Sequence, residues 1–171
     1  MITVESGIYG GVSAGGIDFG IAKNPTAIIS HPDQFDYYNG AGVDFTFMGV
    51  GEMDKEGNVN STKMGSICPG AGGFVDITQN AKNVVFCSTF TAKGLDVDFC
   101  HGRVNIRKEG QVKKLVDKVL QISYNGQLAR EKRQKMHLVT ERAVFELREE
   151  GPVLIEIAPG IDIAKDVLSQ M

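Results

Sequence analysis

The chain has 171 residues, of which 42% are hydrophobic and 23% are charged, and its formal net charge is -3. This length predicts one compact domain with a substantial core, and no apolar run approaches the roughly 20 residues that a membrane span requires. The small negative charge gives no reason to expect nucleic acid or an anionic membrane as a partner, and the N-terminus lacks the basic and apolar regions of a signal peptide.

The three cysteines, Cys68, Cys87 and Cys100, are an odd number without C-x-x-C spacing. That pattern argues against a disulfide framework and against a zinc ribbon. A reducing cytoplasm is the simplest compartment for such a chain. The histidines are scattered along the sequence, so no metal site is expected.

The first half of the chain holds most of its 21 glycines, which predicts short elements joined by turns. In chain order we expect a strand over 2–4, a loop over 6–20, a short buried strand over 26–29, a helix over 31–40 and a strand over 43–50. A turn over 52–59 then leads into another short extended segment. A glycine loop is expected to open a helix over 74–81.

The second half carries the clearest strand, a continuous apolar run over 83–90, which is typical of the middle of a sheet covered on both faces. Cys87, within this run, is expected to fill the core. Beyond it we expect a helix over 112–120, although an extended segment would also bury its valines. A solvated charged segment over 130–135, strands over 139–147 and 153–157, and a terminal helix over 162–171 capped by Asp162 then follow. The order strand, glycine loop, helix, strand predicts an α/β fold.

Glu5 is the first candidate for catalysis. It closes the short β-branched run Ile2-Thr3-Val4 and precedes the bend at Ser6-Gly7. An ionised carboxylate held at a rigid strand-to-loop corner can act as a nucleophile on an acyl group. An exposed glutamate beside a turn most often has no catalytic function, but here a second glycine loop can serve the other half of the same reaction.

That second loop is Gly70-Ala71-Gly72-Gly73-Phe74. Because it is mostly glycine, almost no side chains cover its peptide N–H groups. Such N–H groups can hold a developing oxyanion, at about 3 kcal/mol for one donor. Two alternatives stay open, because the glycines could only permit close packing, or the helix start could bind an anion. Neither G-x-x-x-x-G-K-[ST] nor G-x-G-x-x-G occurs, so a nucleotide phosphate site has little support.

Lys93 lies just past the central strand, in Thr91-Ala92-Lys93-Gly94. Open α/β sheets bind ligands beyond the carboxyl ends of their strands. Lys93 is therefore a candidate contact for a phosphate or a carboxylate.

Several short motifs then follow one another along the chain. They are Val4-Glu5-Ser6-Gly7, Gln34-Phe35-Asp36-Tyr37, Gly57-Asn58-Val59-Asn60, the loop over 70–76, the strand over 84–91, and Thr140-Glu141-Arg142-Ala143-Val144-Phe145. In order and spacing they resemble the C-terminal part of the class I coenzyme A transferases. Within that family the chain is most similar to the acetate, propionate and short-chain acyl enzymes and to succinyl-CoA:3-ketoacid CoA transferase.

The resemblance implies an open, mainly parallel α/β sheet flanked by helices, with residues 1–171 as the catalytic-glutamate portion of a CoA-transferase domain. The nucleophilic glutamate of the family falls on Glu5. The oxyanion- and CoA-binding residues implied by the G-x-G-G-[FA] loop are Gly70, Gly72, Gly73 and Phe74. We expect the backbone N–H groups of Gly72 and Gly73 to steady the oxyanions. Coenzyme A is implied as a substrate, and no tightly bound cofactor is expected.

The implied activity is a ping-pong transfer of CoA between carboxylic acids. Glu5 attacks an acyl-CoA to give an anhydride, the CoA thiolate returns to form a glutamyl–CoA thioester, and a second carboxylate completes the exchange. Two alternatives remain open: hydrolysis of acyl-CoA through the same intermediate, and a non-catalytic assembly module.

The chain departs from the family pattern at its start. Only four residues precede Glu5, whereas in the family several strands and helices, and another related half, come before the glutamate. We therefore expect a fragment, truncated at the N-terminus, with little or no transferase activity alone. Its expected partner is the missing N-terminal half or a partner subunit, and the complete enzyme is expected to be a homo-oligomer.

Overall fold

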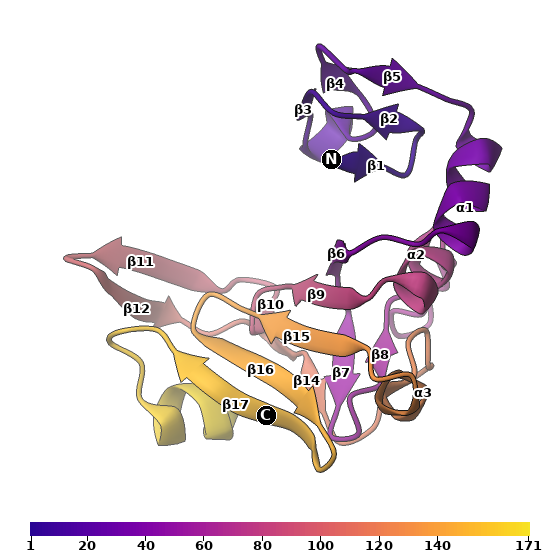
Figure 1. Ribbon diagram of the computed structural model, residues 1–171. Coiled ribbons are helices and arrows are strands. Elements are labelled where there is room, and N and C mark those ends of the chain that lie inside the picture. Colours follow the sequence, from indigo (N-terminus) through magenta and orange to yellow (C-terminus); the bar gives the residue numbers. More distant parts are fainter.

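The computed structural model describes residues 1–171, and its centre is a five-stranded sheet (Figure 1). The strand order is β17-β16-β15-β9-β6, with bounds Phe45–Gly49 for β6, Asn83–Cys87 for β9, Lys135–Val139 for β15, Ala143–Arg148 for β16 and Gly151–Ile157 for β17. β6, β9 and β15 are parallel to one another, whereas β16 and β17 continue the sheet in antiparallel pairing. The predicted α/β class is confirmed, and the sheet is mixed, with its parallel part on the β6 side.

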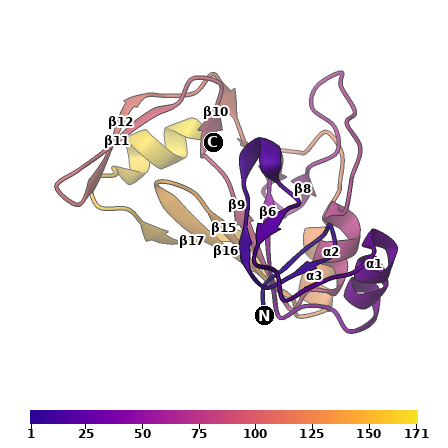
Figure 2. The same cartoon turned by 90° about the horizontal axis from the view of Figure 1, so that it is seen from above.

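Three short helices pack beside this sheet. They are α1 (His31–Gly40), α2 (Phe74–Asn80) and α3 (Gly126–Glu131), of which α1 packs against α2 and α3 packs against β15 and β16. Figure 2 shows all three on one side of the molecule, whereas the C-terminal helical turns over Ile163–Val167 and Leu168–Gln170 lie on the other. No helix combines the length and the apolar composition that crossing a membrane requires.

Side chains next to the helix starts explain where two of these helical segments begin. The Ser30 hydroxyl accepts a hydrogen bond from the N–H of Asp33 at the start of α1. The Asp162 carboxylate accepts one from the N–H of Lys165 at 2.8 Å. Each bond satisfies a backbone donor that has no partner within its own helix. The predicted cap at Asp162 is confirmed.

The core is built where β9 and β15 meet α2 and the segment before α3. The buried side chains of β9 are Val84 and Phe86, which lie two residues apart and therefore on the same face of the sheet. Leu138 of β15, which pairs with Phe86, is also almost fully buried. The Phe86 ring stacks on Phe74 at a centroid distance of 5.8 Å and meets the edge of Tyr124 at 5.2 Å. This packing fixes where α2, and hence the glycine loop before it, begins.

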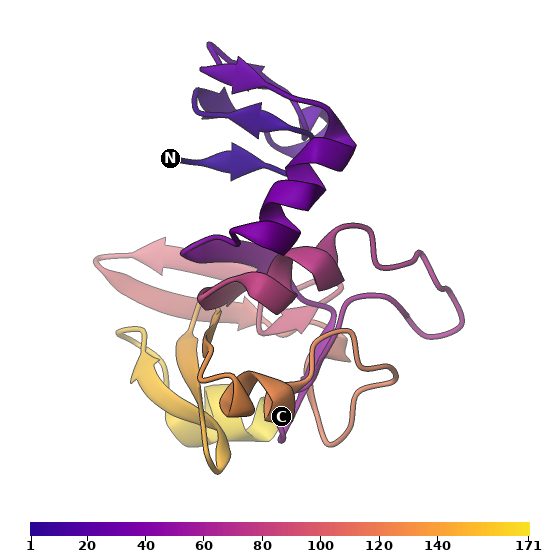
Figure 3. The same ribbon diagram turned by 45° about the vertical axis from the view of Figure 1, so that its right-hand side comes forward.

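A second, smaller sheet forms the N-terminal layer, which α1 joins to the rest of the chain (Figures 1 and 3). Its antiparallel strands are β1 (Thr3–Val4), β2 (Ile8–Tyr9) and β5 (Ala27–Ile28), and the hairpin of β3 (Val12–Ser13) and β4 (Ala22–Lys23) and a helical turn over Gly16–Asp18 lie between β2 and β5 in the chain. The loop predicted over 6–20 is therefore wrong in part. The predicted strand over 26–29 forms, but it is not buried, because β5 is an edge strand and Ile28 is 69% exposed.

Short strands beside the main sheet correct other predictions. They are β7 (Glu52–Asp54), β8 (Val59–Asn60), β10 (Thr91–Ala92), β11 (Asp96–Cys100), β12 (Arg103–Lys108), β13 (Val112–Lys113) and β14 (Leu115–Val116). The predicted helix over 112–120 is wrong, because Val112 pairs with Ala92 and Leu115 pairs with Met53. Distant strands supply these pairings, so the helical spacing of the apolar residues was coincidental. The strand predicted over 139–147 forms as β16, but the predicted start is wrong, since Val139 ends β15 and a turn precedes Ala143.

Candidate active site

Glu5 lies in a three-residue turn, Glu5-Ser6-Gly7, that joins β1 to β2. The Gly7 N–H donates to the Val4 carbonyl at 3.0 Å, and the Ile29 N–H donates to the Gly7 carbonyl at 2.9 Å. Gly7 has φ +97°, a left-handed conformation that glycine adopts without strain. These bonds tie the turn to the entry of α1, so the predicted rigid strand-to-loop corner is present.

The Glu5 carboxylate lies directly against Gly73, the residue that precedes α2. A Cβ on Gly73 would lie 2.5 Å from Glu5 Oε2 and 2.6 Å from Cζ of Phe35. A side chain at this position would have to displace the Glu5 carboxylate or the Phe35 ring, so the glycine makes room for the carboxylate. The structure thus brings together the two segments that the sequence singled out, from opposite ends of the first half of the chain.

Two peptide N–H groups of this loop are free for a ligand, whereas the Phe74 N–H donates to the Ala71 carbonyl at 3.1 Å. The hydrogen bonds formed within the chain use neither the Gly72 nor the Gly73 N–H. Gly70 and Gly72 have φ +96° and +51°, so glycine suits the bends at both positions. Unused N–H groups beside a carboxylate can donate to an oxyanion that forms when the carboxylate reacts.

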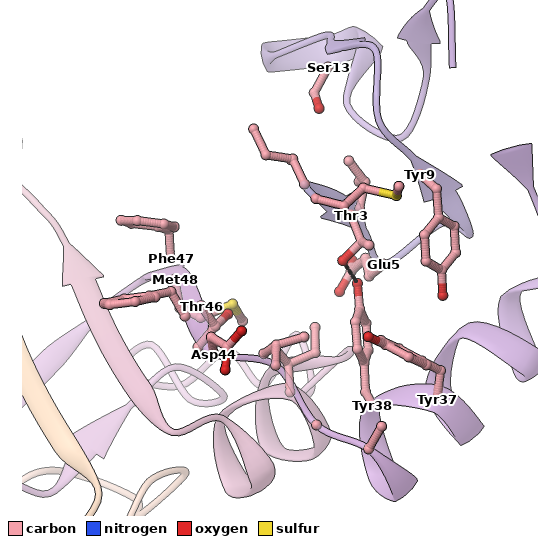
Figure 4. Close-up of a pocket in the computed structure, with 18 of the residues that line it drawn as sticks. Thr3, Glu5, Tyr9, Ser13, Tyr37, Tyr38, Asp44, Thr46, Phe47 and Met48 are labelled. Atoms are coloured by element: carbon pink, nitrogen blue, oxygen red, sulfur yellow. Dashed lines mark hydrogen bonds between the residues drawn. The ribbon is translucent and has the colours of Figure 1, made fainter. Parts of the chain in front are cut away.

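Glu5 also lines an open cleft of about 960 Å³ between the N-terminal layer, α1 and β6. Of its 20 lining residues 13 are hydrophobic, which suits the apolar part of an acyl group. In Figure 4, Glu5, Thr3 and Tyr38 lie on one wall, while Thr46, Phe47 and Met48 lie on the wall opposite. A substrate in this cleft would be open to water on one side.

Tyr38 is the residue beside Glu5 that sequence reasoning did not assign to the site. Its hydroxyl is 2.9 Å from Thr3 Oγ1, and the side chain is 4% exposed. Burial is the main cause that raises the pKa of Tyr38, and the Glu5 carboxylate raises it further. Tyr38 therefore keeps its proton near Glu5 at neutral pH. The only signal in the sequence was its spacing of three from Phe35, which places both on one face of the predicted helix.

Other predicted site residues lie elsewhere. Phe74 is 4% exposed with its ring in the core. Its N–H donates to the Ala71 carbonyl and its carbonyl accepts from the Thr78 hydroxyl, so neither its ring nor its backbone is free for a ligand. Lys93 is exposed in the turn between β10 and β11 and is not among the residues that line the Glu5 cleft. Cys87 is exposed at the end of β9, so the prediction that it fills the core is wrong. No three His, Cys, Asp or Glu side chains gather as a metal site.

No family model matches the chain. Among individual proteins, the chain is 42% identical over 171 residues to the acetate CoA-transferase YdiF of Escherichia coli O157:H7, covering 100% of this chain and 32% of that protein. It is 42% identical over 175 residues to the caffeate CoA-transferase of Acetobacterium woodii, covering 99% of this chain and 33% of that protein. The chain thus spans about a third of the length of the curated relatives it matches.

Solved structures agree with these similarities. The crystal structure of the YdiF apoenzyme from Escherichia coli O157:H7 matches 99% of this chain with a TM-score of 0.92 and 41% identity, and 32% of that chain is covered. A thioester complex of YdiF with CoA matches with the same TM-score of 0.92. The fold described above therefore occurs as one part of a larger chain.

Proposed function

Because the chain is a partial member of the CoA-transferase family, we propose that residues 1–171 are the catalytic-glutamate portion of an enzyme that transfers coenzyme A between a short-chain acyl-CoA and a carboxylic acid. The observation that carries this proposal is the contact between the Glu5 carboxylate and Gly73, beside free N–H groups and an apolar cleft. Family membership gives the reaction class, and the contact gives the proposed nucleophile.

In the first half of the reaction, a Glu5 carboxylate oxygen attacks the thioester carbon of the acyl-CoA. A carbon–oxygen bond forms, the carbon–sulfur bond breaks, and the CoA thiolate leaves with the electron pair. The product is an acyl–glutamyl anhydride. The Gly72 and Gly73 N–H groups are proposed to donate to the tetrahedral oxyanion, each worth about 3 kcal/mol in typical enzymes.

In the second half, the thiolate attacks the carbonyl carbon of Glu5. The bond from this carbon to the bridging oxygen of the anhydride breaks, so the original acid leaves as a carboxylate and a glutamyl–CoA thioester remains. An acceptor carboxylate then repeats both steps in reverse. The apolar cleft would hold the acyl group, and the further polypeptide proposed below would keep water from the anhydride.

We also propose that further polypeptide closes this cleft in the complete enzyme, as an N-terminal half or a partner subunit, within a homo-oligomer. Two sheets of the chain end in unpaired strands, β1 and β6, which border the cleft. Phe45 and Phe47 on β6 are 60% and 69% exposed. Two exposed aromatic side chains on a free edge strand are unusual and mark a surface that other polypeptide can cover. The isolated chain should therefore turn over slowly or not at all.

The test is mass spectrometry after incubation with acetyl-CoA. It compares the isolated chain with a YdiF chimera, in which this chain replaces the matching third of the Escherichia coli enzyme. We expect a CoA adduct on the Glu5 peptide of the chimera and little or none on the isolated chain. Glu5→Gln should remove the adduct, whereas Glu150→Gln, a matched change at an exposed glutamate without an ion pair, should keep it.

A folded chimera that carries no adduct, or carries it at another residue, contradicts the proposed nucleophile. Robust turnover by the isolated chain contradicts the need for further polypeptide. An acceptor acid separates the two reactions, because transfer converts added propionate into propionyl-CoA. Equal release of free CoA with and without propionate would instead indicate hydrolysis.

A further inference from the structure

Gln34 on α1 is a buried polar side chain without a partner. Its side chain is 0% exposed, and neither Oε1 nor Nε2 makes a hydrogen bond. No other buried side-chain nitrogen or oxygen in the chain lacks a partner in this way. A buried unpaired carboxamide destabilises a fold, so such a group calls for a specific explanation.

Gln34 lies on the segment of α1 whose two ends contact the residues around Glu5. Ser30, Gln34 and Tyr38 are spaced by four residues, so they follow one another along a single face of α1. At one end of this face, Ile29 binds the Gly7 carbonyl at 2.9 Å. At the other end, the Tyr38 hydroxyl is 2.9 Å from Thr3 Oγ1.

Thr3 and Gly7 each lie two residues from Glu5. Gln34 lies midway in sequence between their two contacts, Ile29 just before α1 and Tyr38 within it. The next residue, Phe35, reaches the same point on Gly73 as the Glu5 carboxylate. The unpaired carboxamide therefore belongs to the stretch of α1 that is joined at both ends to the Glu5 segment.

We propose that Gln34 is a positioning residue for Glu5, an inference that rests on the proposed function. In the unreacted chain the Glu5 carboxylate faces Gly73. Once it is converted to an anhydride or a thioester, the bulky group must extend into the cleft and the Glu5 carbonyl must be held in a new orientation. The Gln34 carboxamide, with two N–H donors and one acceptor oxygen, supplies the hydrogen bond that fixes the Glu5 segment in this state.

The first part of the test measures thermal unfolding of the full 171-residue chain. Gln34→Met keeps the side-chain shape and removes an unpaired polar group, so the Tm should rise by about 2–4 °C. Gln134→Met is the matched control, because the Gln134 carboxamide accepts from the Tyr124 hydroxyl at 2.8 Å and donates to the Thr78 carbonyl at 2.7 Å. Its Tm should fall, since the change leaves those partners unpaired.

The second part measures the formation of the Glu5–CoA adduct and steady-state kinetics in the YdiF chimera. Gln34→Met should lower kcat and the rate of adduct formation about tenfold and leave KM unchanged, because the missing bond is made only in the covalent state. An unchanged or lower Tm, or an unchanged kcat, overturns the role of Gln34. Absence of any Glu5 adduct in the unsubstituted chimera is a different result, because then the proposed function fails and the role of Gln34 falls with it.

Discussion

At the scale of single residues, the candidate site depends on Gly73 having no side chain. Gly73 has an ordinary backbone conformation, φ -81° and ψ 0°, so its backbone does not require glycine. What requires glycine is the space, because a Cβ would lie within 3 Å of both the Glu5 carboxylate and the Phe35 ring. Glycine is thus favoured at position 73 by its neighbours, the Glu5 carboxylate and the Phe35 ring. At Gly70 and Gly72 it is favoured by the positive φ of the backbone.

This distinction predicts the effect of Gly73→Ala. The added methyl group should displace the Glu5 carboxylate, which is the flexible partner in the contact, with little change in stability. A displacement near 1 Å at a reacting group can lower a rate by about a hundredfold. The initial rate of CoA-adduct formation in the YdiF chimera measures this loss.

Gly40→Ala is the matched control, because Gly40 lies at the end of α1 with nothing within 4 Å of the added Cβ. It should leave the rate of adduct formation unchanged. An unaltered rate in Gly73→Ala would show that the carboxylate does not work from the position described here.

At the scale of elements, a buried arginine joins three parts of the C-terminal half. Arg142, in the turn before β16, is 0% exposed and donates to Glu109 at 2.6 Å and to Glu141 at 2.6 Å. It also donates to the Asp166 carbonyl at 2.8 Å, and its guanidinium lies 4.8 Å from the centre of the Phe90 ring. These bonds hold the C-terminal helical turns and the segment after β12 against the turn between β15 and β16, at one end of the main sheet.

The Glu109 carboxylate makes this junction sensitive to acid. Burial pushes the pKa of Glu109 upward, but hydrogen bonds from Arg142 and Thr91 outweigh burial and lower the pKa below its usual 4.5. A carboxylate with a lowered pKa stabilises the fold above its unfolded value, and the stabilisation is lost as the pH falls through the folded value. We therefore expect the free energy of unfolding to decrease below about pH 4.5.

Urea denaturation of the chain between pH 3 and pH 7 measures this dependence. Glu109→Gln should be less stable at pH 7 and should show a shallower decrease with acid, because one titrating group is gone. Glu150→Gln, at an exposed position, should follow the original chain. Identical pH profiles for the original chain and Glu109→Gln would contradict the assignment.

At the scale of the whole molecule, exposed apolar side chains lie on both walls of the cleft, at the free edge of the main sheet and in the N-terminal layer. Phe45 and Phe47 point away from the sheet two residues apart, and Ile2 of the N-terminal layer, across the cleft, is 69% exposed. A free strand edge with aromatic side chains is prone to pair with other polypeptide. The isolated chain should therefore self-associate.

Replacing both phenylalanines by lysine should keep the chain monomeric with an unchanged fold, because charged side chains on an edge strand oppose pairing. Light scattering after size-exclusion chromatography measures the change. Phe99→Lys is the matched control, since Phe99 is 71% exposed but lies on the β11–β12 hairpin away from this edge. Equal self-association of all three chains would show that the β6 edge is not the contact.

Several structural features were predicted correctly from residues that lie close together in the sequence. The apolar run of β9, the entry of α1 and the cap at Asp162 depend on residues close together in sequence, so they were predicted. The order of the motifs also indicated the CoA-transferase family. Local signals failed where burial comes from distant pairing, as for Val112 and Leu115, and where a strand ends at the surface, as for Cys87.

By itself, the sequence indicated the family and the α/β class and singled out two candidate segments, because these depend on residue types and their spacing. Only the tertiary structure decided that the Glu5 carboxylate lies against Gly73, that Tyr38 is beside it and that Gln34 is buried without a partner. Those contacts join residues far apart in sequence, and they arise from the packing of α1 between the N-terminal layer and α2. No periodicity or local propensity carries information about such packing.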